Sequence, residues 1–184
     1  MIDLREITPD DAEPLYSWRR EPEVDRWMYS GPPQRMDDHL RWFDAFLADP
    51  DRHGWIITMR GGDCGYLGLS GLKGDHGRAQ WHWYIGEAAA RGRGAGRAAQ
   101  ALGLDLAFER FGLQKVWSEV LAENEVALKS QAAAGFRREG YLRRHMLKFG
   151  VYRDVVLLAL LKEEWAERRA AVRRELVASG LIRG

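Results

Sequence analysis

The stretch that decides the fold is Arg91-Gly92-Arg93-Gly94-Ala95-Gly96, which follows the aromatic run Gln80–Gly86 and precedes a long segment with an apolar stripe. This order predicts a strand, a glycine-rich turn and a helix. Glycines let the backbone approach a ligand closely and adopt conformations that a side chain would forbid. The first N–H groups of the following helix point outward without partners. Such a turn is typical of a pyrophosphate cradle.

Two well-known glycine loops do not fit this stretch. A P-loop needs Lys followed by Ser or Thr after its last glycine, and no such pair occurs near Gly96. A dinucleotide-binding loop needs a further glycine at position 97 or 99, where Arg97 and Ala99 stand. The stretch does match Arg/Gln-x-x-Gly-x-Gly/Ala, and in this it resembles the coenzyme A loop of the GNAT acetyltransferases. The alternative is a flexible surface turn whose arginines aid solubility.

Length and composition indicate one compact enzyme domain. The chain has 184 residues, of which 46% are hydrophobic, enough to form a full core. A net charge of +1 gives no support to a nucleic-acid partner. The single Cys64 cannot form an internal disulfide, and no Cys/His cluster has metal-ligand spacing. There is no signal-peptide core and no apolar run of roughly 20 residues. The expectation is a soluble cytoplasmic protein, monomer or homodimer, without metal or membrane contact.

Periodicity and turn residues predict an alternation of strands and helices. The order is a strand over 2–7, a helix from Thr8, a helix over 35–47, strands over 54–60, 64–72 and 79–86, a helix over 94–111, a strand over 115–121, a helix over 123–134, strands over 136–148 and 151–161, and a charged C-terminal helix. This is the order of the GNAT fold. The resemblance therefore implies a mixed α/β domain over residues 1–161. Its central, mostly antiparallel seven-stranded sheet is splayed at the acetyl-CoA site and flanked by helices. Residues 162–184 are an extra helical extension packed on or beside the same domain.

The resemblance also assigns residues to acetyl-CoA. In the family, the strand before the loop splays from its neighbour. Its free backbone groups, here around Tyr84, Ile85 and Gly86, pair with the pantetheine arm. Asn124, three residues before Ala127, opens a helix beside the cofactor in relatives. Capping a helix is also the ordinary structural role of Asn.

A narrower resemblance is carried by Trp18–Pro22, Trp27–Ser30 and Tyr152–Trp165. These segments are similar to N-acetyltransferases of nucleotide-linked amino sugars, notably those of the pseudaminic-acid pathway type. The implied reaction is direct acetyl transfer from acetyl-CoA to the amino group of an anionic nucleotide-linked amino-deoxysugar.

Five side chains are candidates for binding that acceptor. Arg19 could pair with a diphosphate, and His39 could contact the base or a phosphate. Trp27, Met28 and Tyr29 could form a platform for the apolar face of the sugar. The structural alternatives are a solvated helix end for the arginine and ordinary core packing for Trp27 and Met28.

Other acceptors and roles stay open. A ribosomal-protein or peptide N-terminal acetyltransferase is the enzymatic competitor. An aminoglycoside-type enzyme would need an acidic cleft, whereas Arg19, Arg20 and Arg41 near the expected acceptor side favour an anionic one. A coenzyme A-binding sensor module is the non-enzymatic alternative.

Transfer to an ammonium requires a base. Glu119 matches a carboxylate position in the aminosugar relatives. His82 is the second candidate, because its strand borders the cleft and its unperturbed pKa lies near neutrality. Either side chain could instead be structural, as an exposed strand Glu or a hydrogen-bonded core His.

One departure from the family pattern concerns the acid. The family's usual acid is a Tyr seven residues after the capping Asn, where this chain has Gln131. Ser130, acting through water, or Tyr141 could take the role. The thiolate could also leave without a dedicated donor, because a thiolate is only modestly basic.

Overall fold

A seven-stranded sheet forms the centre of the computed structural model, which describes all 184 residues. Its strands lie in the order β1-β2-β3-β4-β5-β7-β6, and every neighbouring pair is antiparallel except β4 and β5. The strands are β1 (Ile2–Glu6), β2 (Arg52–Met59), β3 (Gly62–Ser70), β4 (Arg78–Ile85), β5 (Lys115–Leu121), β6 (Arg137–Lys148) and β7 (Val151–Leu161). The predicted mixed α/β fold with a mostly antiparallel seven-stranded sheet is confirmed.

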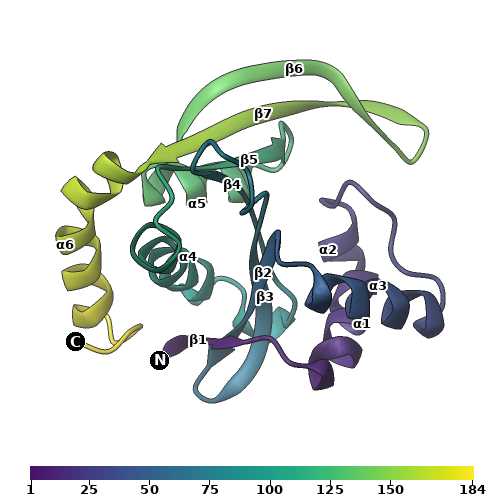
Figure 1. Cartoon of the computed structure of the whole chain (residues 1–184), viewed down its shortest axis with the longest axis horizontal. Coiled ribbons are helices and arrows are strands. Elements are labelled where there is room, and N and C mark those ends of the chain that lie inside the picture. The colour runs from purple at the N-terminus through teal and green to yellow at the C-terminus, as the bar shows by residue number, and fades with distance from the viewer.

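Helices cover both faces of the sheet (Figure 1). The helices are α1 (Ala12–Arg20), α2 (Pro22–Asp25), α3 (Met36–Ala48), α4 (Ala95–Asp105), α5 (Glu125–Ala134) and α6 (Lys162–Ala178). On one face, Trp18 of α1 and Phe43 of α3 are buried with Ile56 of β2 in a small apolar cluster. On the other face, α4 and α6 enclose the larger core, which includes Leu104 and Trp165. Two separate cores therefore hold the two layers of helices to one sheet.

The aromatic strand β4 is packed from both sides. Added Cβ atoms at Gly103 and Gly96 of α4 would lie 2.8 Å from the rings of Trp81 and Trp83, so α4 sits directly on these indoles. Tyr84, the residue after Trp83, packs instead with the cluster of α1 and α3. Successive strand residues point to opposite faces. The strand β4 therefore contacts one layer of helices through Trp81 and Trp83 and the other layer through Tyr84.

The sheet opens at its only parallel pair. β4 and β5 are in register from Arg78 opposite Lys115 to Gln80 opposite Trp117, and no pairing continues beyond that point. From Trp81 onward, β4 keeps its partner β3 on one side and has a free edge on the other. The splay expected from the family resemblance is therefore present.

The C-terminal extension packs on the same core. Trp165 and Leu176 of α6 are buried, and Asp105 at the end of α4 accepts hydrogen bonds from Trp165 Nε1 at 3.0 Å and Arg169 Nε at 2.7 Å. After α6, the chain returns to the first strand, where Ile2 N donates to Leu181 O at 2.6 Å. The tail thereby closes the free edge at the start of β1.

Element boundaries lie close to the predicted ones, but the short helix α2 was not predicted and one other helix differs. The helix expected over 94–111 ends as an α-helix at Asp105 and continues as one wider π-helical turn, Leu106–Arg110. This turn keeps Ala107 and Phe108 buried while the chain changes direction before β5. No helix of the structure is both long and apolar enough to cross a bilayer.

Candidate active site

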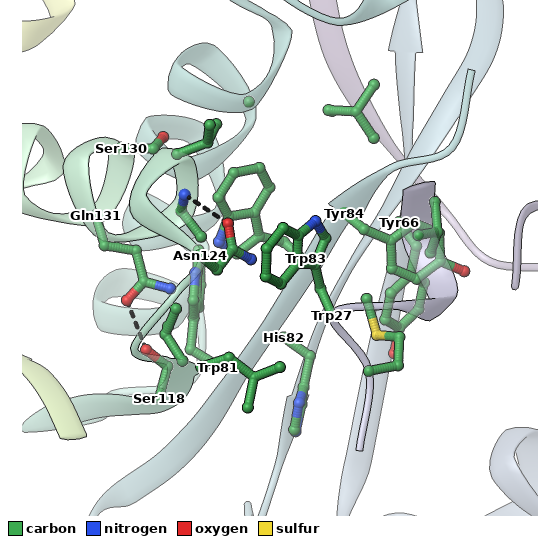
Figure 2. Close-up of a pocket in the computed structure, with 18 of the residues that line it drawn as sticks. Trp27, Tyr66, Trp81, His82, Trp83, Tyr84, Ser118, Asn124, Ser130 and Gln131 are labelled. Carbon is green, nitrogen blue, oxygen red and sulfur yellow. Dashed lines mark hydrogen bonds between the residues drawn. The ribbon is translucent and has the colours of Figure 1, made fainter. Parts of the chain in front are cut away.

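The splay between β4 and β5 opens into a cavity of about 1310 Å³. Its walls are β4 and β5, the loop before α4, the start of α5, and on the far side α1, α2 and the segment after α2. Figure 2 shows the aromatic side chains of β4 in this wedge, with α5 residues on one side and Trp27 on the other. One continuous cleft thus joins the glycine-rich loop to the predicted acceptor residues.

The loop presents a row of free N–H groups. The backbone nitrogens of residues 92–97 donate no hydrogen bond, and the first bonded amide after them is Ala98 N, which donates to Gly94 O at 3.0 Å. Gly92 and Gly94 have φ of +71° and +83°, a backbone region that L side chains rarely adopt. The cradle at the helix N-terminus suits the two phosphates of coenzyme A.

The loop's arginines have different roles. Arg91 donates from Nε to Ile85 O at 3.0 Å and from Nη2 to Gly86 O at 2.8 Å, so it ties the loop to the end of β4. Arg97 pairs with Glu175 of α6 while still lining the cleft. Arg93 is exposed and does not line the cleft, because the loop turns it outward. Of these three arginines, Arg91 is the one that holds the loop against the end of β4.

The free edge of β4 supplies the next part of the site. Tyr84 and Ile85 line the cleft, as expected. Gly86 does not: its N–H donates to Cys64 O at 2.9 Å, and an added Cβ would lie 2.2 Å from the Trp18 ring. The expectation for Gly86 is therefore corrected to a close-packing role against α1.

Asn124 caps a helix and also lines the cleft. Its Oδ1 accepts from Ala127 N at 3.1 Å and so caps α5, and both residues also line the cleft (Figure 2). Because the cap uses only the oxygen, the amide nitrogen of Asn124 stays free on the side of the cleft.

Comparison with known proteins agrees with this geometry. The family model described as acetyltransferase (GNAT) domain matches residues 2–137. The chain belongs to the GNAT acetyltransferases. It is an N-acetyltransferase that uses acetyl-CoA, and the free N–H groups of residues 92–97 with the open edge of β4 fit that coenzyme.

Individual relatives of this GNAT chain are distant. An uncharacterized N-acetyltransferase, p20 of Bacillus licheniformis, is 26% identical over 90% of this chain and 95% of its own. Spermidine N(1)-acetyltransferase of Escherichia coli K12 is 22% identical over 89% and 88%. The crystal structure of spermidine N-acetyltransferase from Vibrio cholerae with CoA and spermine superposes with a TM-score of 0.84 at 20% identity, covering 90% and 98%. The fold is shared, and these relatives give no support to the aminosugar subtype.

The segment after α2 forms the wall of the cleft where the acceptor was predicted to bind. Trp27, Met28 and Tyr29 line the cleft as predicted. A residue missed by sequence reasoning holds them: buried Lys148, at the tip of the β6–β7 hairpin, donates from Nζ to Met28 O at 2.7 Å and pairs with Asp25 at 3.1 Å. Its only sequence signal was an isolated Lys beside the expected Phe149-Gly150 turn.

Arg19 lies in the wall of the same cleft. Its Nη2 donates to Ser30 Oγ at 3.0 Å, whereas its Nη1 is buried without any hydrogen-bond partner. No carboxylate pairs with this guanidinium, and burial lowers the pKa of Arg19 from its usual value. A half-buried guanidinium with a buried, unused donor is able to bind an anionic group.

His39 is a corrected prediction. Its side chain is only 3% exposed, its Nε2 lies 2.8 Å from Ala12 O, and its ring stacks on Phe43 within the α1–α3 layer. It does not line the cleft. His39 joins two helices instead of contacting an acceptor.

The two base candidates both line the cleft, but in different environments. Burial and the charge of Arg52 lower the pKa of His82 to about 4, and its Nε2 lies 2.8 Å from Ser70 Oγ. His82 is therefore neutral at pH 7 and a weak base. Glu119 faces Tyr29, since burial and that carboxylate together raise the pKa of the Tyr29 hydroxyl.

The two acid candidates differ in location. Ser130 lines the cleft, where its Oγ accepts from Gln100 Nε2 at 2.8 Å. Tyr141 is 54% exposed on β6 and donates to Asp154 at 2.7 Å, outside the cleft. The expectation for Tyr141 is wrong because the long β6–β7 hairpin carries it past the sheet surface.

Proposed function

We propose that this N-acetyltransferase acts on the primary amine of a small molecule that also carries an anionic group, with a nucleotide-linked amino-deoxysugar as the specific candidate. Arg19 is the observation that supports this most directly. Its half-buried guanidinium has a buried, unpaired Nη1 in the wall of the cleft. Leaving a buried donor unpaired costs about 1–3 kcal/mol, and a phosphate or carboxylate would remove that cost.

The other charges of the cleft favour the same acceptor class. Glu23, Glu123 and Glu125 line the cleft but are paired with Arg26, Arg153 and Lys129. Glu119 is therefore the lining carboxylate without a cationic partner. A polyamine carries several ammonium groups and would need several free carboxylates. On the acceptor side of the cleft, Arg19 and Glu119 are the cation and the carboxylate without an ionic partner, and they suit an acceptor with one anionic group and one amine.

The body of the acceptor would lie against segment 26–31. Trp27 and Tyr29 offer flat apolar surfaces, and Met28 adds a flexible one. The guanidinium of Arg26 stacks on the Trp27 ring, 4.6 Å from its centre. A deoxysugar has an apolar face of matching size and a polar rim that the cleft's hydroxyl and carboxylate groups can bind.

The mechanism follows from the positions of the side chains. Acetyl-CoA supplies the acetyl group as a reactive thioester. Residues 92–97 hold its phosphates through backbone N–H groups, and the free edge of β4 aligns its arm. Glu119 takes the proton of the acceptor ammonium, directly or through water, and Tyr29 lies beside this carboxylate. Neutral His82 adds no charge to the wall of the cleft.

The experiment is an acceptor panel read by release of free thiol from acetyl-CoA. Nucleotide-linked amino sugars should be acetylated with a lower KM than the same sugars without the nucleotide. Arg19→Gln should raise the KM of the anionic acceptor by about 10- to 100-fold, the value of a charge-assisted hydrogen bond, and leave affinity for coenzyme A unchanged. Arg20→Gln is the matched control, because Arg20 also bonds to the following loop, at Pro33 O, but does not line the cleft.

A polyamine is the second candidate acceptor, favoured by the likeness to the spermidine acetyltransferases of Escherichia coli and Vibrio cholerae. Faster turnover of spermidine than of any anionic amine, with Arg19→Gln improving it, would establish the polyamine function and refute the anionic one. Turnover of N-terminal peptides alone would point to protein acetylation. Tight coenzyme A binding with no turnover of any amine would indicate a sensor.

A further inference from the structure

A buried pair of polar side chains lines the cleft at the point where β4 and β5 separate. Ser118 of β5 and Gln131 of α5 are each 2% exposed, and Ser118 Oγ donates to Gln131 Oε1 at 2.5 Å. Both residues line the cleft, and Figure 2 shows the pair beside Trp81. This hydrogen bond uses the oxygen of the Gln131 amide and leaves its nitrogen to be accounted for.

The unused atom is the amide nitrogen of Gln131. Because its Oε1 accepts the proton of Ser118, the amide orientation is set and Nε2 turns away from β5. This nitrogen donates no hydrogen bond anywhere in the structure. In Figure 2 it points from Ser118 toward Trp81, into the wedge. The wedge therefore contains an oriented neutral donor with no protein partner.

The position of the pair in the sheet indicates which side of the cleft this donor faces. Trp81 and Ser118 are the first residues beyond the last paired positions, Gln80 and Trp117, so they mark the point where the strands separate. Ser118 and Glu119 are consecutive on β5 and point to opposite faces. Gln131 and Glu119 thus flank the wedge from opposite sides, Glu119 with the acceptor residues and Gln131 with the helices of the coenzyme site.

We propose that the amide of Gln131 donates a hydrogen bond to the thioester sulfur of acetyl-CoA and stabilises the leaving thiolate without protonating it. The bond from the amine nitrogen to the acetyl carbon forms, and the carbon–sulfur bond breaks with its electron pair going to sulfur. Glu119 has by then passed the ammonium proton to solvent, so the acceptor attacks as a neutral amine. Gln131 keeps both of its amide protons, the proton that the new amide nitrogen loses goes to Glu119, and the thiolate is protonated later by solvent. Ser118 is a positioning residue that holds the amide in this orientation.

The inference depends on coenzyme A binding and on no particular acceptor. Its test uses free coenzyme A without acceptor. In the wild-type protein, the pKa of the bound thiol should lie below that of a free thiol, about 8.5. The titration is followed by the ultraviolet absorbance of the thiolate. Gln131→Leu should raise the bound thiol pKa by about 1–2 units, which is the contribution of one hydrogen bond to a charged group.

Two further variants separate donation from packing. Ser118→Ala should give a smaller rise, because the amide remains but is free to rotate. Gln114→Leu makes the same chemical change at an exposed glutamine outside the cleft and should leave the thiol pKa unchanged. A coenzyme analogue without sulfur should bind wild type and Gln131→Leu equally, whereas coenzyme A at high pH should prefer the wild type.

Several results would overturn the proposal. An unchanged thiol pKa in folded Gln131→Leu that still binds coenzyme A would show that the amide does not contact sulfur. If Gln131→Leu does not fold, an unchanged thiol pKa in Ser118→Ala together with equal binding of both coenzymes by wild type at high pH would do the same. None of these readings involves an amine, so failure here leaves the acceptor proposal untouched.

Discussion

The two halves of the cleft are built from different parts of the chain. The coenzyme half consists of backbone: unpaired N–H groups of residues 92–97 and the free edge of β4. The acceptor half consists of side chains on segment 26–31, which Lys148 anchors from 120 residues further along the chain. A backbone site tolerates changes of side chain but not of backbone conformation. A side-chain site can change its ligand by one substitution, which is how one fold accepts different amines.

The largest effect is expected where the two halves meet, at Glu119. Glu119→Gln keeps the size and hydrogen bonding of the side chain but removes its basicity, so kcat should fall by roughly 10²- to 10⁴-fold. His82→Gln should slow turnover far less, because a histidine whose pKa is lowered to about 4 is already a weak base. Steady-state kinetics with saturating acetyl-CoA measures both.

Glu123→Gln is the matched control for this prediction. Its carboxylate also lines the cleft but is occupied by Arg153 at 2.8 Å. If His82→Gln proved the crippling change, the base would be the imidazole. If neither variant slowed turnover tenfold, positioning of an amine deprotonated in solution would explain the rate better than a protein base.

The second prediction breaks the coenzyme half alone. Gly94→Val places a branched side chain at φ +83°, with its Cβ 2.7 Å from Leu181. The loop must move to accommodate it, and coenzyme A affinity should fall by about 100-fold, since a strained conformation of this kind costs up to about 3 kcal/mol. Calorimetry with coenzyme A measures the loss.

Gly61→Val separates backbone strain from loss of the cradle. Gly61 has a similar φ of +86°, in the β2–β3 turn, with open space around its Cβ position. This variant should lose stability but keep coenzyme A affinity. Equal coenzyme A binding by folded Gly94→Val and wild type would contradict the assignment of residues 92–97 to the phosphates.

This contrast also explains how far the sequence alone could be interpreted. The glycine spacing of the loop encodes a local backbone geometry, so the turn with free N–H groups at residues 92–97 could be predicted from one short stretch. The strand and helix order could be predicted because apolar periodicity reports local structure. The π-helical turn after Asp105 could not, since it depends on how α4 meets β5 in three dimensions.

The acceptor half was harder to predict because its determinants are long-range. His39 looks the same in sequence whether it faces a ligand or, as here, Ala12 O and Phe43. Tyr141 follows α5 closely in the sequence, but it lies on the β6–β7 hairpin, outside the cleft. The anchoring role of Lys148 and the pairing of Ser118 with Gln131 join segments that no local pattern connects.

The third prediction tests the acceptor half alone and has the smallest expected effect on activity. Lys148→Met removes the cation that holds Asp25 and the carbonyl of Met28, and both groups then remain buried without a partner. The protein should lose about 3–5 kcal/mol of stability, as expected when one member of a buried ion pair is removed. Because Trp27–Tyr29 would no longer be held against the cleft, the acceptor KM should rise by roughly tenfold, the equivalent of about 1.4 kcal/mol. Coenzyme A affinity should not change, since residues 92–97 and the β4 edge have no contact with this lysine.

Lys115→Met is the control, because its pair with Glu139 at 2.6 Å lies on the outer part of the same sheet and outside the cleft. Denaturant unfolding gives the stability, and separate titrations of acceptor and acetyl-CoA divide the effect between the halves. A parallel loss of coenzyme A affinity in Lys148→Met would mean that the two halves of the cleft are coupled rather than independently built.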